Sequence, residues 1–177
     1  HMATTAFAAR GRELPADTGL DRSDRKQLAE MLGEALASTY VLYHKTHAYH
    51  WNVAGPLFYS VHKLTDEQYQ ELANAVDELA ERIRAIGFAA PTGLAEYAKH
   101  SVVKDVSGIP VAGEMIAELA DDHQRVAASL RKMVEEAERI EDVYTADLLT
   151  GRIGVHEEAA WMLNAMLVED SKGGQAA

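Results

Sequence analysis

Prolines are few in this chain, and they are placed so that long segments between them are free to form helices. Only four occur among 177 residues, and a proline ends or kinks an α-helix because it lacks a backbone N–H. In the segments between them, apolar residues recur at positions i, i+3, i+4 and i+7, which is the stripe of an amphipathic helix. No strand pattern competes with this one. The spacing predicts an all-α fold.

Four long helices and one short helix follow from this pattern. We expect the long helices over residues 23–52, 56–86, 111–140 and 145–169, and the short one over residues 94–100. Pro56 suits the first position of the second helix, and Gly87 suits the position just past its end. Because a long connection separates the second long helix from the third, the sequence predicts a four-helix bundle whose crossover connection carries the short helix.

The length is that of one ordinary domain. Residues 1–22 lack apolar periodicity and are expected to form a mobile arm, in which His1 before Met2 is interpreted as a remnant of an expression vector. The bundle is assigned to residues 23–170 and a flexible tail to residues 171–177.

Composition restricts the side chains available as metal ligands to imidazoles and carboxylates. The chain has 8 His, 28 Asp and Glu, no Cys and a formal net charge of −11, so disulfides, thiolate zinc sites and iron–sulfur clusters are excluded. The charge argues against a surface built for nucleic-acid phosphates. The sequence contains no run of about 18 apolar residues, the length needed to span a membrane. It also shows no signal-peptide pattern, so we expect a cytoplasmic protein. Association with the nucleoid is left open.

Four potential metal ligands lie along one stripe of the second long helix. His62, Asp66, Asp77 and Glu81 fall at roughly 0°, 40°, 60° and 100° around a helix, and each neighbouring pair has i, i+4 spacing. The two pairs are centred roughly 22 Å apart along the axis, so one ion cannot bind both. The stripe is either two separate half-sites or a solvated charged face.

A twofold axis would make the two halves complementary. If two copies of this helix packed antiparallel about a point between Glu71 and Leu72, His62 would face Glu81 of the partner subunit. Asp66 would then face the partner's Asp77, and an isologous dimer would hold two equal sites. Three carboxylates at one place need a cation to offset their repulsion.

His50, at the end of the first helix, adds a second imidazole to each expected site. This mixed nitrogen and oxygen set suits iron, with zinc or manganese as competitors. In-chain di-iron bundles carry Glu-x-x-His motifs, and none of the 8 His here has a Glu three residues before it. Ordinary ferritins and di-iron oxygenases are therefore disfavoured as close relatives.

The same residues resemble a known family. The chain from about Asp24 to Glu169 is similar to the Dps family of mini-ferritins, and the motifs that carry the resemblance are His50-Trp51-Asn52-Val53-x-Gly55, Val61-His62-x-x-x-Asp66 and Asp77-Glu78-Leu79-Ala80-Glu81-Arg82-Ile83. The resemblance implies a ferritin-like fold, a hollow homododecamer and a ferroxidase centre between subunits. That centre would oxidise Fe(II) with hydrogen peroxide, and the ferric product would be deposited in the cavity of the shell. Its ligands would be His50, His62 and Asp66 of one subunit with Asp77 and Glu81 of its mate.

Four further residues have a functional and a structural alternative. Trp51 would lie beside the centre, where it could donate an electron to a stray oxidant or simply pack as an apolar ring. His47 would support a ligand by a hydrogen bond or make an ordinary polar contact. Asp142 and Asp147 would line a threefold pore for cations or stabilise the start of the last helix.

DNA binding is the property for which the sequence offers least support. Arg10 and Arg12 are the candidate contacts in the arm, but the segment up to Lys26 has a net charge of only +1. Twelve arms would add avidity, yet twelve acidic chains would repel phosphate at long range. We expect weak or absent DNA binding at physiological salt.

Overall fold

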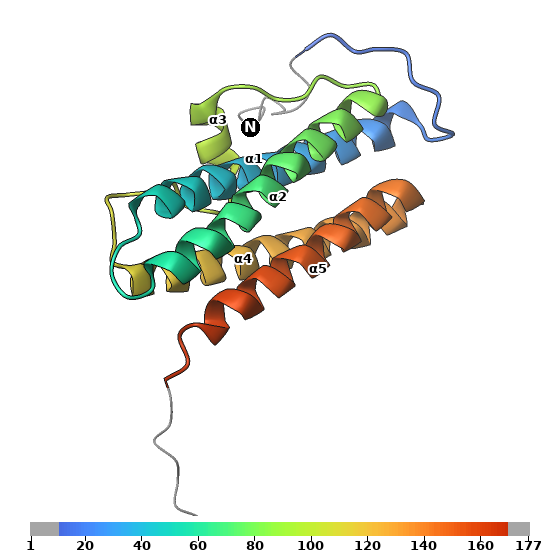
Figure 1. Ribbon diagram of the computed structural model, residues 1–177. Helices are drawn as coiled ribbons and strands as arrows, with labels where there is room; N and C mark the ends of the chain where they lie inside the picture. Colours follow the sequence, from blue (N-terminus) through green and yellow to red (C-terminus); the bar gives the residue numbers. More distant parts are fainter. Residues whose placement is uncertain (1–10, 170–177) are drawn as a thin grey trace, which may run out of the picture.

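The computed structural model describes residues 11–169, which form five α-helices and no strand (Figure 1). The helices are α1 (Arg22–Asn52), α2 (Phe58–Ala85), α3 (Leu94–His100), α4 (Ala112–Arg139) and α5 (Val143–Ala165). The expected all-α fold is confirmed. None of these helices is long and apolar enough to cross a membrane.

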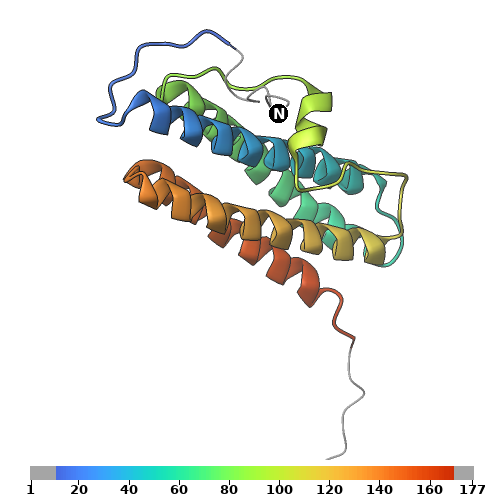
Figure 2. The same ribbon diagram turned by 180° about the vertical axis from the view of Figure 1, so that it is seen from behind.

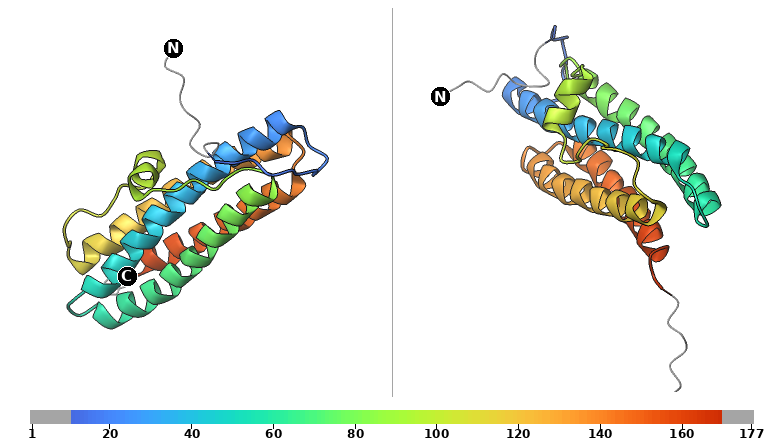
Figure 3. Two further views of the ribbon diagram at one scale, coloured as in Figure 1. Left: turned by 90° about the horizontal axis from the view of Figure 1, so that it is seen from above. Right: turned by 90° about the vertical axis from the view of Figure 1, so that its left-hand side faces the viewer.

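Two helix pairs, α1 with α2 and α4 with α5, lie against each other to form the bundle (Figures 1 and 2). Lys45 of α1 contacts Asp122 of α4, and Tyr49 of α1 contacts Glu118, so α1 is antiparallel to α4 as well as to α2. The parallel helices α2 and α4 therefore need a long crossover. Figure 3 shows this connection running back along the bundle, with α3 lying over α1.

The core consists of the inward faces of the four long helices. Tyr49 and Phe88 are the largest fully buried side chains. The core also contains apolar side chains that folding removes from water: Leu28, Leu32, Leu36, Leu42, Leu72, Leu79, Ile83, Met115, Ile116 and Leu119. Burying one such side chain contributes about 1.5–3 kcal/mol. The periodic stripes in the sequence thus become one continuous core.

The start of α2 differs from the expectation by two residues. The Phe58 N–H donates to the Gly55 carbonyl over 3.0 Å, so residues 55–58 form a turn before the helix begins. Pro56 occupies the second position of this turn, which its restricted φ also suits. Gly87 does follow the end of α2, with a φ of 103° that favours glycine.

The bounds of α5 also differ from the expected 145–169. The Asp142 side chain accepts the Thr145 N–H, so Asp142 is the N-cap and the helix begins at Val143. At the other end, the Met166 and Leu167 N–H groups bond three residues back, to Leu163 and Asn164. These tighter bonds end the helix at Ala165.

Part of the expected mobile arm is fixed to the bundle. The Leu14 N–H donates to the Gly87 carbonyl over 2.9 Å, and Arg22 pairs with Glu13, its Nε lying 2.9 Å from Oε2. Part of residues 11–21 therefore contacts the end of α2, and the mobility expected for the arm stays a prediction. Residues 1–10 and the tail 171–177 lie outside the described residues.

Candidate metal centre

The residues of α2 divide into a buried face and an outward face. The buried face carries mostly apolar side chains, with one hydroxyl and one amide among them: Val61, Thr65, Gln68, Leu72, Ala75, Leu79 and Ile83. Outside it, His62 and Asp66 are half-buried, whereas Asp77 and Glu81 are exposed. The stripe that the sequence singles out therefore lies away from the core of its own bundle.

His50 and His62 form a stacked pair at the turn between α1 and α2. Their ring centroids are 3.8 Å apart and their planes are inclined by 15°. His50 Nδ1 lies 2.8 Å from the carbonyl oxygen of His62, and His62 Nδ1 lies 2.8 Å from the carbonyl oxygen of His50. Two reciprocal hydrogen bonds therefore hold the rings to each other's backbone.

These bonds determine which nitrogen of each ring is available. A carbonyl oxygen only accepts, so each Nδ1 carries a proton and donates it, and each neutral ring keeps a lone pair on Nε2. A metal-binding histidine characteristically donates its other nitrogen to a carbonyl or carboxylate in this way. The pair can offer two Nε2 atoms to metal ions.

Asp66 is held by two neighbours on α2. Gln70 Nε2 donates to its Oδ2 over 3.1 Å, and the Tyr69 hydroxyl bonds the same carboxylate. Burial and this bond to Asp66 raise the pKa of Tyr69. The Tyr69 ring also meets His50 edge-on, with 5.2 Å between centroids. Tyr69 thus contacts two of the expected ligands, a role that ligand spacing alone does not reveal.

One chain does not assemble a complete centre. Within residues 11–169, no three His, Asp or Glu side chains gather closely enough to hold a metal ion. On α2, Asp66 and Asp77 are separated by on the order of 16 Å of helix. The described part of the chain therefore carries two separated pairs of potential ligands on α2, and their role as half-sites that pair between subunits stays a prediction.

Trp51 and His47 lie beside the histidine pair. The His47 ring stacks on Tyr69 with 4.1 Å between centroids and lies 4.2 Å from Trp51. Burial lowers the pKa of His47, and the neighbouring imidazoles His50 and His44 lower it further. Trp51 remains 57% exposed, so its ring is not packed in the core of its own chain. Both residues are near the half-site, and their functional roles stay predictions.

Asp142 and Asp147, the candidates for a cation pore, have different surroundings. Asp142 is buried, and its two oxygens accept from Arg82 Nη2 at 3.1 and 3.0 Å. Burial opposes its ionisation, but hydrogen bonds from Thr145 and Arg82 outweigh that effect and lower the pKa of Asp142. The capping alternative is therefore favoured for Asp142. Asp147 is exposed, and the pore alternative stays open there.

The basic residues of the arm are only partly free. Arg12 is exposed, but Arg22 is paired with Glu13, and Arg25 donates to a backbone carbonyl at the end of α2 over 2.8 Å. Arg10 lies outside the described residues. The positive charge left for a nucleic acid is smaller than the sequence count indicates.

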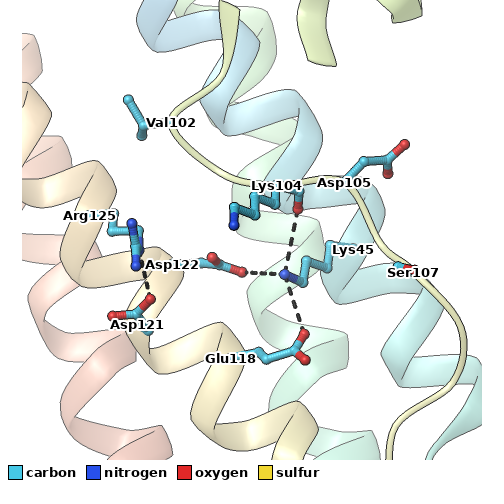
Figure 4. A pocket seen from close by; sticks show the side chains of 9 residues that line it. All are labelled: Lys45, Val102, Lys104, Asp105, Ser107, Glu118, Asp121, Asp122 and Arg125. Atoms are coloured by element: carbon cyan, nitrogen blue, oxygen red, sulfur yellow. Dashed lines mark hydrogen bonds and ion pairs between the residues drawn. The ribbon is translucent and has the colours of Figure 1, made fainter. Parts of the chain in front are cut away.

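Lys45 has no role in the sequence interpretation. It lies on α1 and is buried against α4 and the connection that precedes α4 (Figure 4). Its Nζ lies 2.8 Å from Asp122 Oδ2 and 3.4 Å from Glu118 Oε2. A cavity of about 330 Å³ opens beside it. Its lining combines charged residues of both signs with two neutral ones: Lys45, Val102, Lys104, Asp105, Ser107, Glu118, Asp121, Asp122 and Arg125. The lysine is neutralised by its partners, so we interpret it as a structural tie.

His123 and His156 also have no role in the sequence interpretation, yet they meet in the core. Their Nδ1 atoms are 2.9 Å apart, and both side chains are buried. They lie on different helices, α4 and α5, so spacing along the chain carries no signal for their contact.

Known proteins resemble the chain over most of its length. Residues 29–172 match the family model of the ferritin-like domain. DNA protection during starvation protein 2 of Bacillus anthracis is 37% identical over 142 residues, covering 80% of this chain and 97% of that one. The crystal structure of a Dps protein from Bacillus brevis has 32% identity and a TM-score of 0.80, covering 84% and 100%. A Dps protein from Vibrio cholerae O1, described as a ferritin-like diiron-carboxylate protein, has 30% identity and a TM-score of 0.81, covering 89% and 100%.

Proposed function

The chain belongs to the Dps family of ferritin-like proteins, and we propose that it oxidises Fe(II) at a centre shared by two subunits and stores the ferric product in a closed shell. Hydrogen peroxide is the proposed oxidant. The proposed ligands are His50, His62 and Asp66 of one subunit with Asp77 and Glu81 of its twofold mate. Removing Fe(II) and peroxide together would protect the cell and its DNA from oxidative damage.

The observation that carries this proposal is the reciprocal bonding of His50 and His62. Both Nδ1 atoms are occupied by backbone carbonyls, so both Nε2 atoms are left as ligands. Asp66 lies one turn beyond His62 on the same helix, where its carboxylate can join them. A fixed pair of imidazoles with an adjacent carboxylate is half of a di-iron site, and it needs further carboxylates.

Asp77 and Glu81 are suitable for the other half. They are exposed and have the same i, i+4 spacing as His62 and Asp66, so a twofold axis would bring the two pairs together. Each complete site would hold three carboxylates and two imidazoles. Carboxylates neutralise the charge that builds up as iron is oxidised, and imidazoles suit iron, with zinc and manganese as competitors.

Two ferrous ions at one site allow peroxide to be reduced fully. Each Fe(II) gives one electron, so two Fe(II), one hydrogen peroxide and two protons yield two Fe(III) and two waters. A single Fe(II) would instead release a hydroxyl radical. Holding both ions at one centre is therefore the protective feature of the proposed reaction.

We propose a homododecamer as the assembly, since the ferric product needs an enclosed space. Asp147 is the candidate for an ion-entry pore, because it lies with Glu138 and Glu141 at an open cavity of about 570 Å³ near the α4–α5 turn. Acidic side chains there would attract Fe(II). A cytoplasmic location stays a prediction.

Replacing both histidines tests the proposal. His50→Ala with His62→Ala should abolish rapid, peroxide-dependent oxidation of Fe(II), measured by the rise in ferric absorbance. The matched control is His44→Ala, which removes an exposed imidazole from α1 and should leave the initial rate unchanged. Initial rates equal to the unmodified protein in the double variant would contradict the assignment.

A redox-inert zinc site is the alternative to a ferroxidase centre. Adding Zn(II) during turnover distinguishes them, because zinc that competes for the proposed ligands should slow both iron oxidation and peroxide consumption. A protein that binds zinc there and never consumes peroxide with Fe(II) would be a structural metalloprotein.

A further inference from the structure

The middle of the bundle contains a polar layer formed by four helices. On one side, Tyr43 of α1 meets Tyr69 of α2 and Lys45 of α1 meets Asp122 of α4, so Tyr69 and Asp122 lie at the same level. On the other side, Glu71 of α2 meets Arg152 of α5.

Helices α2 and α5 run antiparallel, so the residues that face each other can be followed one helical turn beyond Glu71 and Arg152. Because Arg152 is opposite Glu71, His156 is opposite residues 67–68 of α2, and His156 contacts His123 of α4. Both routes therefore place Gln68, His123 and His156 at one level along the bundle, and all three side chains are buried.

A chain of polar contacts leads into this layer from the surface. Glu71 is partly exposed and forms an ion pair with Arg152, whose Nη2 lies 3.2 Å from Glu71 Oε2. The same Nη2 lies 3.3 Å from His156 Nε2. His156 Nδ1 then lies 2.9 Å from His123 Nδ1.

The direction of these hydrogen bonds follows from Arg152, which can only donate. His156 Nε2 must accept, so the His156 proton is on Nδ1 and is donated to His123 Nδ1. His123 then carries its proton on Nε2. The pair is neutral, and its outer end is an N–H donor.

That donor has no partner among residues 11–169, and it is not alone. His123 Nε2, Arg152 Nε and both amide atoms of Gln68 are buried without a hydrogen-bond partner in the described part of the chain. Gln68 is 8% exposed and His123 is 2% exposed. A buried polar atom without a partner loses its hydrogen bonds to water and gains none in return, so native cores rarely contain such atoms.

We propose that the layer is a binding site for a buried water molecule between Gln68 and His123. A water molecule can accept from His123 Nε2–H and from the Gln68 amide nitrogen, and it can donate to the Gln68 oxygen. These are three partners, which is typical of buried water. The bridge joins α2 to the α4–α5 pair at mid-bundle.

Charge selects water over an ion. The Arg152 cation is already balanced by Glu71, so an anion would bring an uncompensated charge into the core. A cation would lie beside Arg152 and face N–H donors. The layer therefore suits a neutral molecule that accepts more hydrogen bonds than it donates.

A joint X-ray and neutron crystal structure of the full-length protein tests the site directly. We expect one water within hydrogen-bond distance of His123 Nε2 and the Gln68 amide, with deuterium on His123 Nε2 and on His156 Nδ1. A metal ion or halide at that position would overturn the proposal. So would a direct Gln68–His123 bond with no water, or deuterium on His123 Nδ1.

A double-mutant cycle tests the bridge in solution. Gln68→Leu should lower the denaturant midpoint when His123 is present, because His123 loses its bridged acceptor, and should lower it much less in a His123→Leu background. Gln124→Leu, an exposed glutamine on α4, is the matched control and should shift the midpoint equally in both backgrounds. Equal shifts for Gln68→Leu in the two backgrounds would contradict the bridge, and if either variant does not fold, the diffraction result decides.

Discussion

The reciprocal bonds between His50 and His62 join the end of α1 to the start of α2, and they use the Nδ1 atom of each ring. Each bond uses the partner residue's own backbone carbonyl, so a ring can turn only if it gives up its own hydrogen bond. Thr65 Oγ1 is a second neighbour of His50 Nδ1, at a distance of 3.4 Å. Backbone geometry thus determines how both rings are oriented. In the proposed centre, a ligand that is held before the metal arrives would lose less entropy on binding.

Gly87 holds the segment before α1 against the end of α2, because its carbonyl accepts the Leu14 N–H. Its φ is 103°, and a Cβ there would lie 2.9 Å from the Leu14 carbonyl oxygen, a backbone atom that cannot rotate away. We predict that Gly87→Ala lowers the free energy of unfolding by about 1–3 kcal/mol. It should also release residues 11–21, so that limited proteolysis with trypsin cleaves faster after Arg12.

Gly151→Ala is the matched control for this prediction. Gly151 lies inside α5 with nothing within 4 Å of an added Cβ, so alanine should raise helix stability by up to about 1 kcal/mol. Stability and cleavage rates that respond alike to the two substitutions would show that the close approach at Gly87 has no energetic effect.

At the scale of helices, the contact between α4 and α5 makes stability depend on pH. Burial lowers the pKa of His123 to about 3 and that of His156 to about 2, from 6.5 in the unfolded chain. The unfolded state therefore binds more protons below pH 6.5. The stabilisation is complete above pH 6.5 and is lost as the pH falls toward the folded values.

We predict a loss of up to about 1.4 kcal/mol per histidine for each pH unit below 6.5. Urea midpoints at fixed protein concentration, measured between about pH 7.5 and pH 5, check this. Replacing both histidines with glutamine should remove most of this slope, and an unchanged slope would assign it to other groups.

Periodicity predicts the helices of this chain well because burial on α2 and α4 repeats with the helical turn. It does not predict their ends, which depend on individual hydrogen bonds. Pro56 satisfies a turn as readily as a first helical position, and only the bond from Phe58 to Gly55 distinguishes them. Asp142 starts α5 two residues early because its side chain caps the helix, and the docking of residues 11–21 depends on Gly87 in another part of the sequence.

The candidate centre is partly readable from the sequence, since side chains four apart share a face of α2. His62 and Asp66 can be recognised in this way, and so can Asp77 and Glu81. The hydrogen bonds that orient His50 and His62 cannot, because they depend on how the α1–α2 turn brings two backbones together. The pairing of His123 with His156 depends in the same way on the packing of α4 against α5.

At the scale of the whole molecule, charge opposes binding to nucleic acid. Each chain carries −11, so the proposed dodecamer carries about −130 in formal charge. Arg22 and Arg25 are engaged in holding the arm. We predict no retardation of duplex DNA in gels at about 150 mM salt and weak retardation at low salt. Retardation at physiological salt that is lost on deleting residues 1–12 would instead support nucleoid compaction through the arm.

The proposed sharing of the centre between subunits can be tested by a complementation experiment. One variant lacks the histidine half (His50→Ala with His62→Ala), and the other lacks the acidic half (Asp77→Ala with Glu81→Ala). Each alone has every site broken. In a mixed twofold pair, one site combines both defects, while the other combines the intact histidine half of one chain with the intact acidic half of its mate.

Random mixing makes about half of all twofold pairs mixed, so about a quarter of the sites are restored. Co-expressed or co-refolded variants should therefore regain about a quarter of the initial rate of peroxide-dependent Fe(II) oxidation, whereas the separately prepared variants combined without subunit exchange should show none. A centre built within one chain would give no recovery under either condition, because neither chain carries a full ligand set. Recovery upon exchange alone therefore distinguishes an intersubunit centre from an in-chain centre, whatever the oxidant.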